Sequence, residues 1–349
     1  MSKRPAGALA GIAMILLLAA PATRAALPPV RDVVLDRAGL PAAQISATAS
    51  TSRYPINDGS GATIGVSATS ACEVSCNAAD PQQIADFIGT LIHGSEVSLL
   101  TVQLDTPSQV EFDCGFGAEA CYYSGENLIV ISGDDTPDEE GVSREFILAH
   151  EYGHHVAQHR QSPAPFPAAI DWGPARWSSY EHVCQLRRAR EVFPGDEGTH
   201  YFEDPGEAWA ESFAHYRFPH AHVKWPWLAS MKPDAGAFRA IREDTLHPWM
   251  GRTSFQLAGR VPARSSGTTV ESFRTPIDGE VSLRPTGADS HRYELSLQSK
   301  TGRRLRAFRD RAGPTPQLNF TVCGQSRLRA VLSSLRRAGG PFTLQIQRP

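Results

Sequence analysis

Long apolar runs are missing from this sequence after its first 25 residues, so no transmembrane segment is predicted. Cysteine is scarce as well: the chain has 6 Cys, and none of their spacings fits a C-x-x-C zinc site. The net formal charge is only −3 at pH 7, and nothing in the sequence indicates a nucleic-acid partner. These absences exclude an integral membrane protein and argue against cysteine-bound zinc.

The N-terminus has the pattern of a secretory signal peptide. Lys3 and Arg4 form a charged start, an apolar stretch covers residues 8–20, and Thr23-Arg-Ala25 is a small-residue cleavage site. We therefore predict a signal peptide over residues 1–25 and a secreted or periplasmic mature protein.

All 6 cysteines follow the predicted cleavage site. An even number of cysteines in an oxidising compartment suggests three disulfides. The sequence alone leaves many pairings open, but closeness along the chain favours Cys72 with Cys76 and Cys114 with Cys121. Cys184 would then join Cys323.

The segment Leu148-Ala-His-Glu-Tyr-Gly-His-His-Val156 contains an H-E-x-x-H motif formed by His150, Glu151 and His154. Residues four apart lie on one face of an α-helix, about 6 Å between Cβ atoms, so two imidazoles can bind one metal ion. Glu151 lies beside this face and can take a proton from water without being a ligand. The motif predicts a Zn²⁺ site with Glu151 as the catalytic base.

An apolar face and an N-terminal Ser143 support a helix here; its apolar members are Val142, Phe146, Leu148, Ala149, Tyr152 and Val156. His155 and His159 form a second pair four residues apart. No glutamate accompanies this pair, and we expect both side chains to face solvent.

A catalytic zinc needs a third protein ligand. The H-E-x-x-H-x-x-G-x-x-H continuation is absent, because Ala157 and Arg160 stand in the glycine and histidine places. A second helix is predicted from Asp204 and Pro205, and Glu207 on it is the leading candidate. Glu207 could instead complete a capping box with Asp204. The reserve ligands are His182, His200 and His215.

The stretch Glu207-Ala-Trp-Ala-Glu211 resembles the E-x-x-A-D motif of the bacterial neutral zinc metallopeptidases, which are gluzincins. Upstream, Cys114-Gly-Phe-Gly and Cys121 to Ile131 resemble that family's cysteine-flanked strand. The resemblance covers residues 110–216. It implies that Glu207 is the third zinc ligand and that Glu211, standing where the family has aspartate, orients a histidine ligand.

The fold class expected is α+β. Residues 26–70 are predicted to be a flexible segment or pro-segment, and residues 71–251 a zincin-like catalytic domain with a small sheet. Within that domain we expect a strand over Val97–Leu104 and a helix over Ser178–Val192. Leu128–Ile131 is either an edge strand that pairs with an extended peptide substrate or an ordinary sheet strand.

Residues 252–349 carry short alternating strand patterns that predict a β-sandwich. This region resembles the bacterial pre-peptidase C-terminal domain. It has 17 Lys and Arg against 6 Asp and Glu, whereas residues 26–251 have 14 against 31. The basic module is predicted either to contact an anionic cell surface or to dock on its own acidic partner domain.

The function predicted is that of a secreted zinc metallopeptidase acting on protein or peptide substrates. Two alternatives are an inactive, peptidase-like surface-binding protein and a zinc hydrolase of cell-wall peptides. Candidates for the oxyanion donor are Tyr201, His200, His215 and Tyr216, and the sequence does not choose among them. The tryptophans at 225, 227 and 249 are expected to close a core or an interface.

Overall fold

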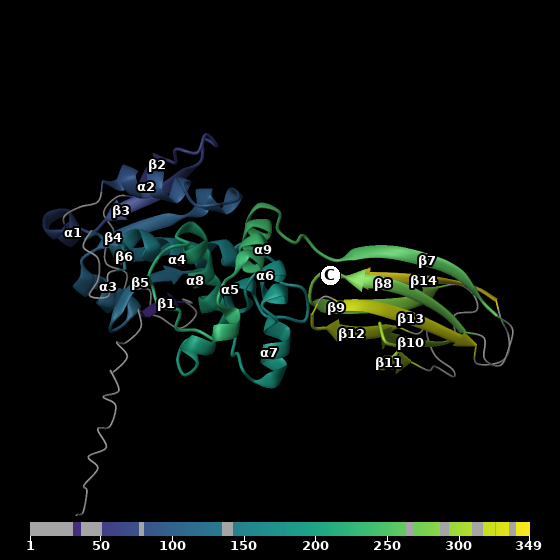
Figure 1. Cartoon of the computed structure of the whole chain (residues 1–349). Coiled ribbons are helices and arrows are strands. Elements are labelled where there is room, and N and C mark those ends of the chain that lie inside the picture. The colour runs from purple at the N-terminus through teal and green to yellow at the C-terminus, as the bar shows by residue number, and fades with distance from the viewer. Residues whose placement is uncertain are drawn as a thin grey trace, which may run out of the picture.

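The computed structural model describes residues 31–35, 51–76, 80–134, 142–262, 268–286, 293–308, 317–324, 326–334 and 340–349. The predicted signal peptide lies outside the described residues. Figure 1 shows two parts, a first one in which helices surround a sheet and a second one made of strands. The chain is thus of the α+β class, as predicted.

The first part contains a mixed six-stranded sheet in the order β1-β5-β6-β4-β3-β2. β4 pairs in parallel with β3 and β6, whereas β5 runs antiparallel to β6 and parallel to β1. The strands are β1 (Arg31–Leu35), β2 (Ser52–Pro55), β3 (Thr63–Ala68), β4 (Thr101–Asp105), β5 (Ala118–Tyr123) and β6 (Leu128–Ser132).

The helices of this part include α4 (Arg144–Gln158), which contacts β5 and β6, and α8 (Pro205–Arg217), which packs along α4. The others are α1 (Ser70–Ser75), α2 (Pro81–Gly89), α3 (Pro107–Cys114), α5 (Ala169–Trp172), α6 (Ala175–Tyr180), α7 (Val183–Ala189) and α9 (Ala235–Leu246), with 3-10 turns at Ser95–Leu99, Tyr201–Glu203 and Ala229–Met231. Among the described residues, no helix combines the length and apolar character needed to cross a bilayer.

The structure corrects several expectations for this part. The segment predicted to be flexible or a pro-segment contributes β2 and β3, and Ile64 and Val66 are buried in the core, so flexibility is wrong for residues 52–68. The pro-segment alternative stays a prediction. β6 lies between β5 and β4, so the edge-strand alternative for Leu128–Ile131 is also wrong. The helix expected over Ser178–Val192 is broken at His182, whose left-handed backbone (φ 59°) separates α6 from α7.

The strand expected over Val97–Leu104 is found only in its second half. A 3-10 turn occupies Ser95–Leu99, and β4 begins at Thr101. An apolar run of this length does not distinguish a strand from a buried turn that leads into one.

The second part is a β-sandwich of two four-stranded antiparallel sheets, in the orders β11-β10-β13-β8 and β12-β9-β14-β7. Alternate apolar side chains of both sheets, Leu283, Leu297, Leu332 and Leu344 among them, form its core. The strands are β7 (Thr253–Val261), β8 (Thr268–Thr275), β9 (Gly279–Thr286), β10 (Tyr293–Ser299), β11 (Arg304–Phe308), β12 (Leu318–Val322), β13 (Ser326–Ser334) and β14 (Gly340–Arg348).

Three disulfides are present, and they are the pairs predicted from the sequence: Cys72–Cys76, Cys114–Cys121 and Cys184–Cys323. The last one joins α7 to the sandwich. Next to it, the Asp278 amide donates to Ser179 Oγ at 2.8 Å and the Glu280 amide donates to the Ala164 carbonyl at 2.8 Å. The junction between the two parts is therefore both covalent and hydrogen-bonded.

Asp278 makes the stability of this junction depend on pH. Its carboxyl group is buried, which raises its pKa to about 7, and Oδ2 has no hydrogen-bond partner among the described residues. Because the raised pKa lies in the folded state, the folded protein binds more protons than the unfolded chain between about pH 4 and 7, and stability falls as pH rises through that range.

We expect Asp278→Asn, which stays neutral, to stabilise the protein by on the order of 2 kcal/mol at pH 8 and by little at pH 4. Thermal unfolding of both proteins at the two pH values measures this. An equal effect of the substitution at pH 4 and pH 8 would contradict the assignment.

Candidate metal centre

Helix α4 presents both histidines of the H-E-x-x-H motif on one buried face. The Ser143 hydroxyl caps the helix by accepting from the Phe146 amide. His150 is 5 % exposed, and Glu151 and His154 are fully buried. These polar side chains lie in the interior, where polar groups need partners or a ligand.

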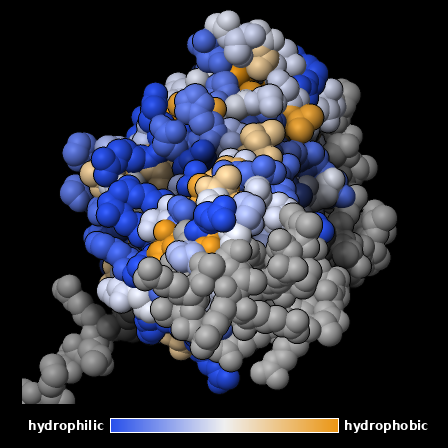
Figure 2. Space-filling model, turned by 90° about the vertical axis from the view of Figure 1, so that its right-hand side faces the viewer, coloured by the Kyte–Doolittle hydropathy of each residue, from blue (hydrophilic) through white to orange (hydrophobic). Residues whose placement is uncertain are grey.

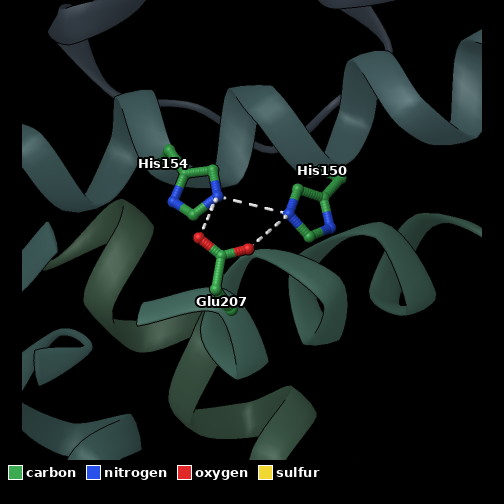
Figure 3. A group of neighbouring side chains, drawn as sticks. All are labelled: His150, His154 and Glu207. Atoms are coloured by element: carbon green, nitrogen blue, oxygen red, sulfur yellow. Dashed lines mark hydrogen bonds and ion pairs between the residues drawn. The ribbon is translucent and has the colours of Figure 1, made fainter. Parts of the chain in front are cut away.

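The third member of the site comes from α8. Asp204 caps this helix by accepting from the Gly206 amide, and Pro205 is its first residue, as the sequence predicted. Glu207 does not act as a capping-box glutamate. Its carboxylate instead lies 3.5 Å from the Nε2 atoms of both His150 and His154, as Figure 3 shows.

The three side chains have the spacing of a tetrahedral metal site. The Nε2 atoms of His150 and His154 are 3.2 Å apart, and one ligand atom from each of the three residues falls within 4.8 Å of the others. Ligand atoms at ~2.05 Å from a tetrahedral zinc ion are roughly 3.3 Å from one another. The residues present therefore fit a divalent cation.

Acidic groups beside the triad affect one another. Burial, followed by the negative charge of Glu207, raises the pKa of the Asp204 carboxyl group to about 8. The Asp204 carboxyl group is therefore largely protonated near pH 7.

Glu211 contacts both His150 and His215. Glu211 Oε2 accepts from His150 Nδ1 at 3.0 Å, which leaves the His150 Nε2 lone pair directed at the triad. Glu211 Oε1 lies 3.4 Å from His215 Nε2. The longer glutamate thus occupies the orienting place that the resemblance assigned to an aspartate.

Aromatic rings cover the same histidine. Trp227 is 7 % exposed and stacks on His150 with ring centroids 6.2 Å apart. Trp225 and Tyr201 pack against Trp227. The sequence predicts tryptophans that close a core or an interface, and it gives no signal for this contact with His150.

The other candidates lie in different environments. His200 stacks on Phe193 with ring centroids 3.7 Å apart, and His182 is the N-cap residue of α7, where it contacts Gln185. The Tyr216 ring packs against Phe238 of α9. Of the three reserve ligands, only His215 is connected to the triad by the described contacts, because it contacts Glu211 and Glu211 contacts His150.

The expectation that His155 and His159 face solvent is wrong. His155 is fully buried: it donates from Nε2 to the Glu96 carbonyl and accepts at Nδ1 from the Tyr122 hydroxyl, both at 2.9 Å. Burial lowers its pKa to about 4, so it is neutral near pH 7. His159 is half-buried and contacts Asn127 at 2.7 Å. The two histidines therefore connect α4 to β5, to the 3-10 turn at Ser95–Leu99 and to the turn between β5 and β6.

Close approach of α4 and α8 brings the triad together, and Gly153 permits it. A Cβ atom on Gly153 would lie 2.9 Å from Cα of Ala210. The Trp209 indole donates to the Gly153 carbonyl at 2.8 Å across the same contact. Glycine is required here because of backbone contact.

We expect Gly153→Ala to force the two helices apart, to destabilise the protein by about 1–3 kcal/mol and to weaken metal binding. Thermal unfolding and a zinc titration measure both effects. Gly125→Ala is the matched control, because a Cβ atom there would have no neighbour within 4 Å. Unchanged zinc affinity in Gly153→Ala would show that the helix contact does not set the triad.

Comparison with known proteins adds little to this geometry. No family model and no curated protein matches the sequence. Among solved structures, the chain is similar to the pre-peptidase C-terminal domain of collagenase from Bacillus anthracis, with 10% identity over 27% of this chain and 88% of that chain, at a TM-score of 0.23. A second similarity is to PliG of Aeromonas hydrophila, a periplasmic inhibitor of g-type lysozyme, with 10% identity over 29% of this chain and 90% of that chain, at a TM-score of 0.21.

Proposed function

We propose that the protein is an exported, zinc-dependent peptidase of the gluzincin type. The observation that carries the proposal is the convergence of His150, His154 and Glu207, from two helices, with Glu151 next to the first histidine. Two neutral imidazoles, one carboxylate and a further position for water are the ligand set of a catalytic zinc site. Two imidazoles and a carboxylate also suit iron, copper and nickel, and zinc is proposed because the H-E-x-x-H spacing places a base beside the first histidine.

Bound zinc would polarise the scissile carbonyl and acidify a water molecule. Side chains of the protein transfer the proton and orient the ligands. Glu151 accepts the proton of the attacking water and later delivers it to the leaving amine. Glu211 keeps the Nδ1 proton of His150 in place, so that the opposite nitrogen remains an acceptor. Of the four candidates for the oxyanion donor, Tyr201 and His215 contact residues that themselves contact His150: Tyr201 packs on Trp227, and His215 contacts Glu211.

Export is part of the proposal. Three disulfides are typical of proteins that mature in an oxidising compartment, which agrees with the signal-peptide pattern at residues 1–25. We therefore propose a secreted or periplasmic location.

Two other functions compete with this one. A binding protein with a structural metal would need no buried base, and the burial of Glu151 beside the triad favours catalysis over that reading. A zinc hydrolase of cell-wall peptides would use the same residues on a different substrate.

Incubation of the mature protein with casein and, separately, with peptidoglycan, each with and without a chelator, distinguishes the three functions. We expect cleavage of casein that the chelator stops and added zinc restores. Cleavage of peptidoglycan alone would assign the protein to cell-wall hydrolysis, and cleavage of neither substrate would favour the binding function.

A further inference from the structure

The outer face of the sheet β11-β10-β13-β8 carries a cluster of positive charge. Phe273 of β8 and Leu328 of β13 point into the core. Their neighbours in sequence, Arg274 and Arg327, are exposed. Arg329 is half-buried on the same outward row of β13. The alternation of a strand puts these three guanidinium groups on one surface.

Strand register brings the cations side by side. Arg327 lies directly opposite Arg274, and Arg329 lies between Ser272 and Gln298 of the two neighbouring strands. Lys300 follows the end of β10 at the same end of the sheet. Together these residues line a groove of about 600 Å³, which we call the basic groove (Arg274, Lys300, Arg327 and Arg329).

The basic groove is not neutralised by the neighbouring residues that the structure describes. None of its four cations forms an ion pair with a described carboxylate, and Glu294, the acidic residue on the outward row of β10, is 3.7 Å from Arg304 instead. Like charges directly opposite each other on adjacent strands destabilise a sheet. An anion in the groove would relieve this repulsion.

The described residues of the acidic part do not line the groove. The junction is made by the disulfide Cys184–Cys323, by the Asp278–Ser179 bond and by Arg188, which donates to the Thr321 carbonyl. Docking of the basic module onto the described residues of its acidic partner therefore does not use these four cations.

We propose that the basic groove binds a linear anionic polysaccharide. A groove of this volume, with cations supplied from β8, β13 and the end of β10, exceeds the needs of a single phosphate or sulfate ion. Single-stranded nucleic acid is bound on exposed aromatic rings, and the aromatic residue at this groove, Phe273, is 7 % exposed. A lipid surface calls for apolar side chains that insert, whereas Val270 is the only exposed apolar side chain among the described residues that line the groove. On the face that Figure 2 turns to the viewer, the described atoms are mainly hydrophilic, with small separate hydrophobic spots.

The basic groove lies at the end of the sandwich that adjoins the first part. The Arg274–Arg327 pair is adjacent to the Thr275–Ser326 pair. The Thr275–Ser326 pair is the last one of β8 and β13 before the junction with the first part. A polysaccharide held there would anchor the protein through the end of the sandwich adjoining the first part, and anchoring raises the local concentration of whatever the surface carries. The inference does not depend on the proposed peptidase activity.

The test is the binding of the full mature protein to immobilised dextran sulfate at 150 mM NaCl. We expect Arg274→Gln/Arg327→Gln to raise the Kd by roughly tenfold to thirtyfold. Arg260→Gln/Arg284→Gln is the matched control, because it removes the same charge from strands of the other sheet, where both side chains are exposed. The control should change the Kd less than about threefold.

Thermal unfolding of both variants separates binding from folding. Arg274→Gln/Arg327→Gln should unfold at or above the temperature of the unsubstituted protein, since repulsion is removed. No retention of the unsubstituted protein at 150 mM NaCl, or equal losses in the two variants, would overturn the proposal. Equally tight binding to phosphatidylserine vesicles would assign the groove to a lipid surface and would also overturn it.

Discussion

Glu151→Gln is expected to lower kcat on casein by about a thousandfold while the protein keeps its zinc. The amide is nearly the same size as the carboxylate, so the packing of this fully buried side chain is preserved, but it cannot accept the proton of the attacking water. Loss of a general base costs on the order of 10²–10⁴ in rate. Steady-state kinetics and zinc content of the same preparation measure the two parts of the prediction.

Glu145→Gln is the control for this substitution. Glu145 lies in the first turn of the same helix, its side chain is 36% exposed, and it pairs with Arg144 outside the triad. We expect it to retain full activity. Activity within a few fold of the unsubstituted protein in Glu151→Gln would remove Glu151 from the chemistry.

Glu207→Ala is expected to weaken zinc binding by more than about a hundredfold and to abolish activity with it. Loss of residues that only orient a ligand already costs about 10- to 100-fold in affinity, and loss of a ligand itself costs more. Because Glu207 is a buried carboxylate among other acidic groups, its removal should not unfold the metal-free protein. Competition with a fluorescent zinc chelator measures the affinity, and circular dichroism measures the fold.

Glu203→Ala is a suitable comparison, since Glu203 precedes α8 and its side chain is 41% exposed. It should bind zinc as the unsubstituted protein does. If Glu207→Ala also retained its zinc, the third ligand would have to be another residue, and His215 would be the first to test because it contacts Glu211.

The local parts of the site could be predicted from the sequence because they depend on helical spacing. The separation of His150 from His154 puts both on one face wherever a helix forms, and Asp204 with Pro205 marks the start of the second helix. The choice of Glu207 over the capping-box role depended on how α8 lies against α4. That choice needed the structure.

The parts that could not be predicted depend on tertiary contacts. The sequence predicts His155 to be a surface residue because it lies near the polar end of the helix. It is buried because Tyr122 of β5 and the Glu96 carbonyl, both distant in sequence, bind its two ring nitrogens. Trp227 lies 73 residues after His154 in the sequence, and no local pattern indicates that it stacks on His150. β2 and β3 were missed because their polar and small residues hide the apolar alternation that Ile64 and Val66 provide.

The central claim is that His150, His154 and Glu207 together bind one catalytic metal ion. Elemental analysis of the active, freshly purified mature protein, combined with X-ray absorption at the zinc edge, tests it most directly. We predict one zinc per chain, bound by two imidazole nitrogens and carboxylate oxygen, and loss of the imidazole signal in His150→Ala/His154→Ala. Full hydrolytic activity in protein that contains no stoichiometric transition metal would contradict the claim.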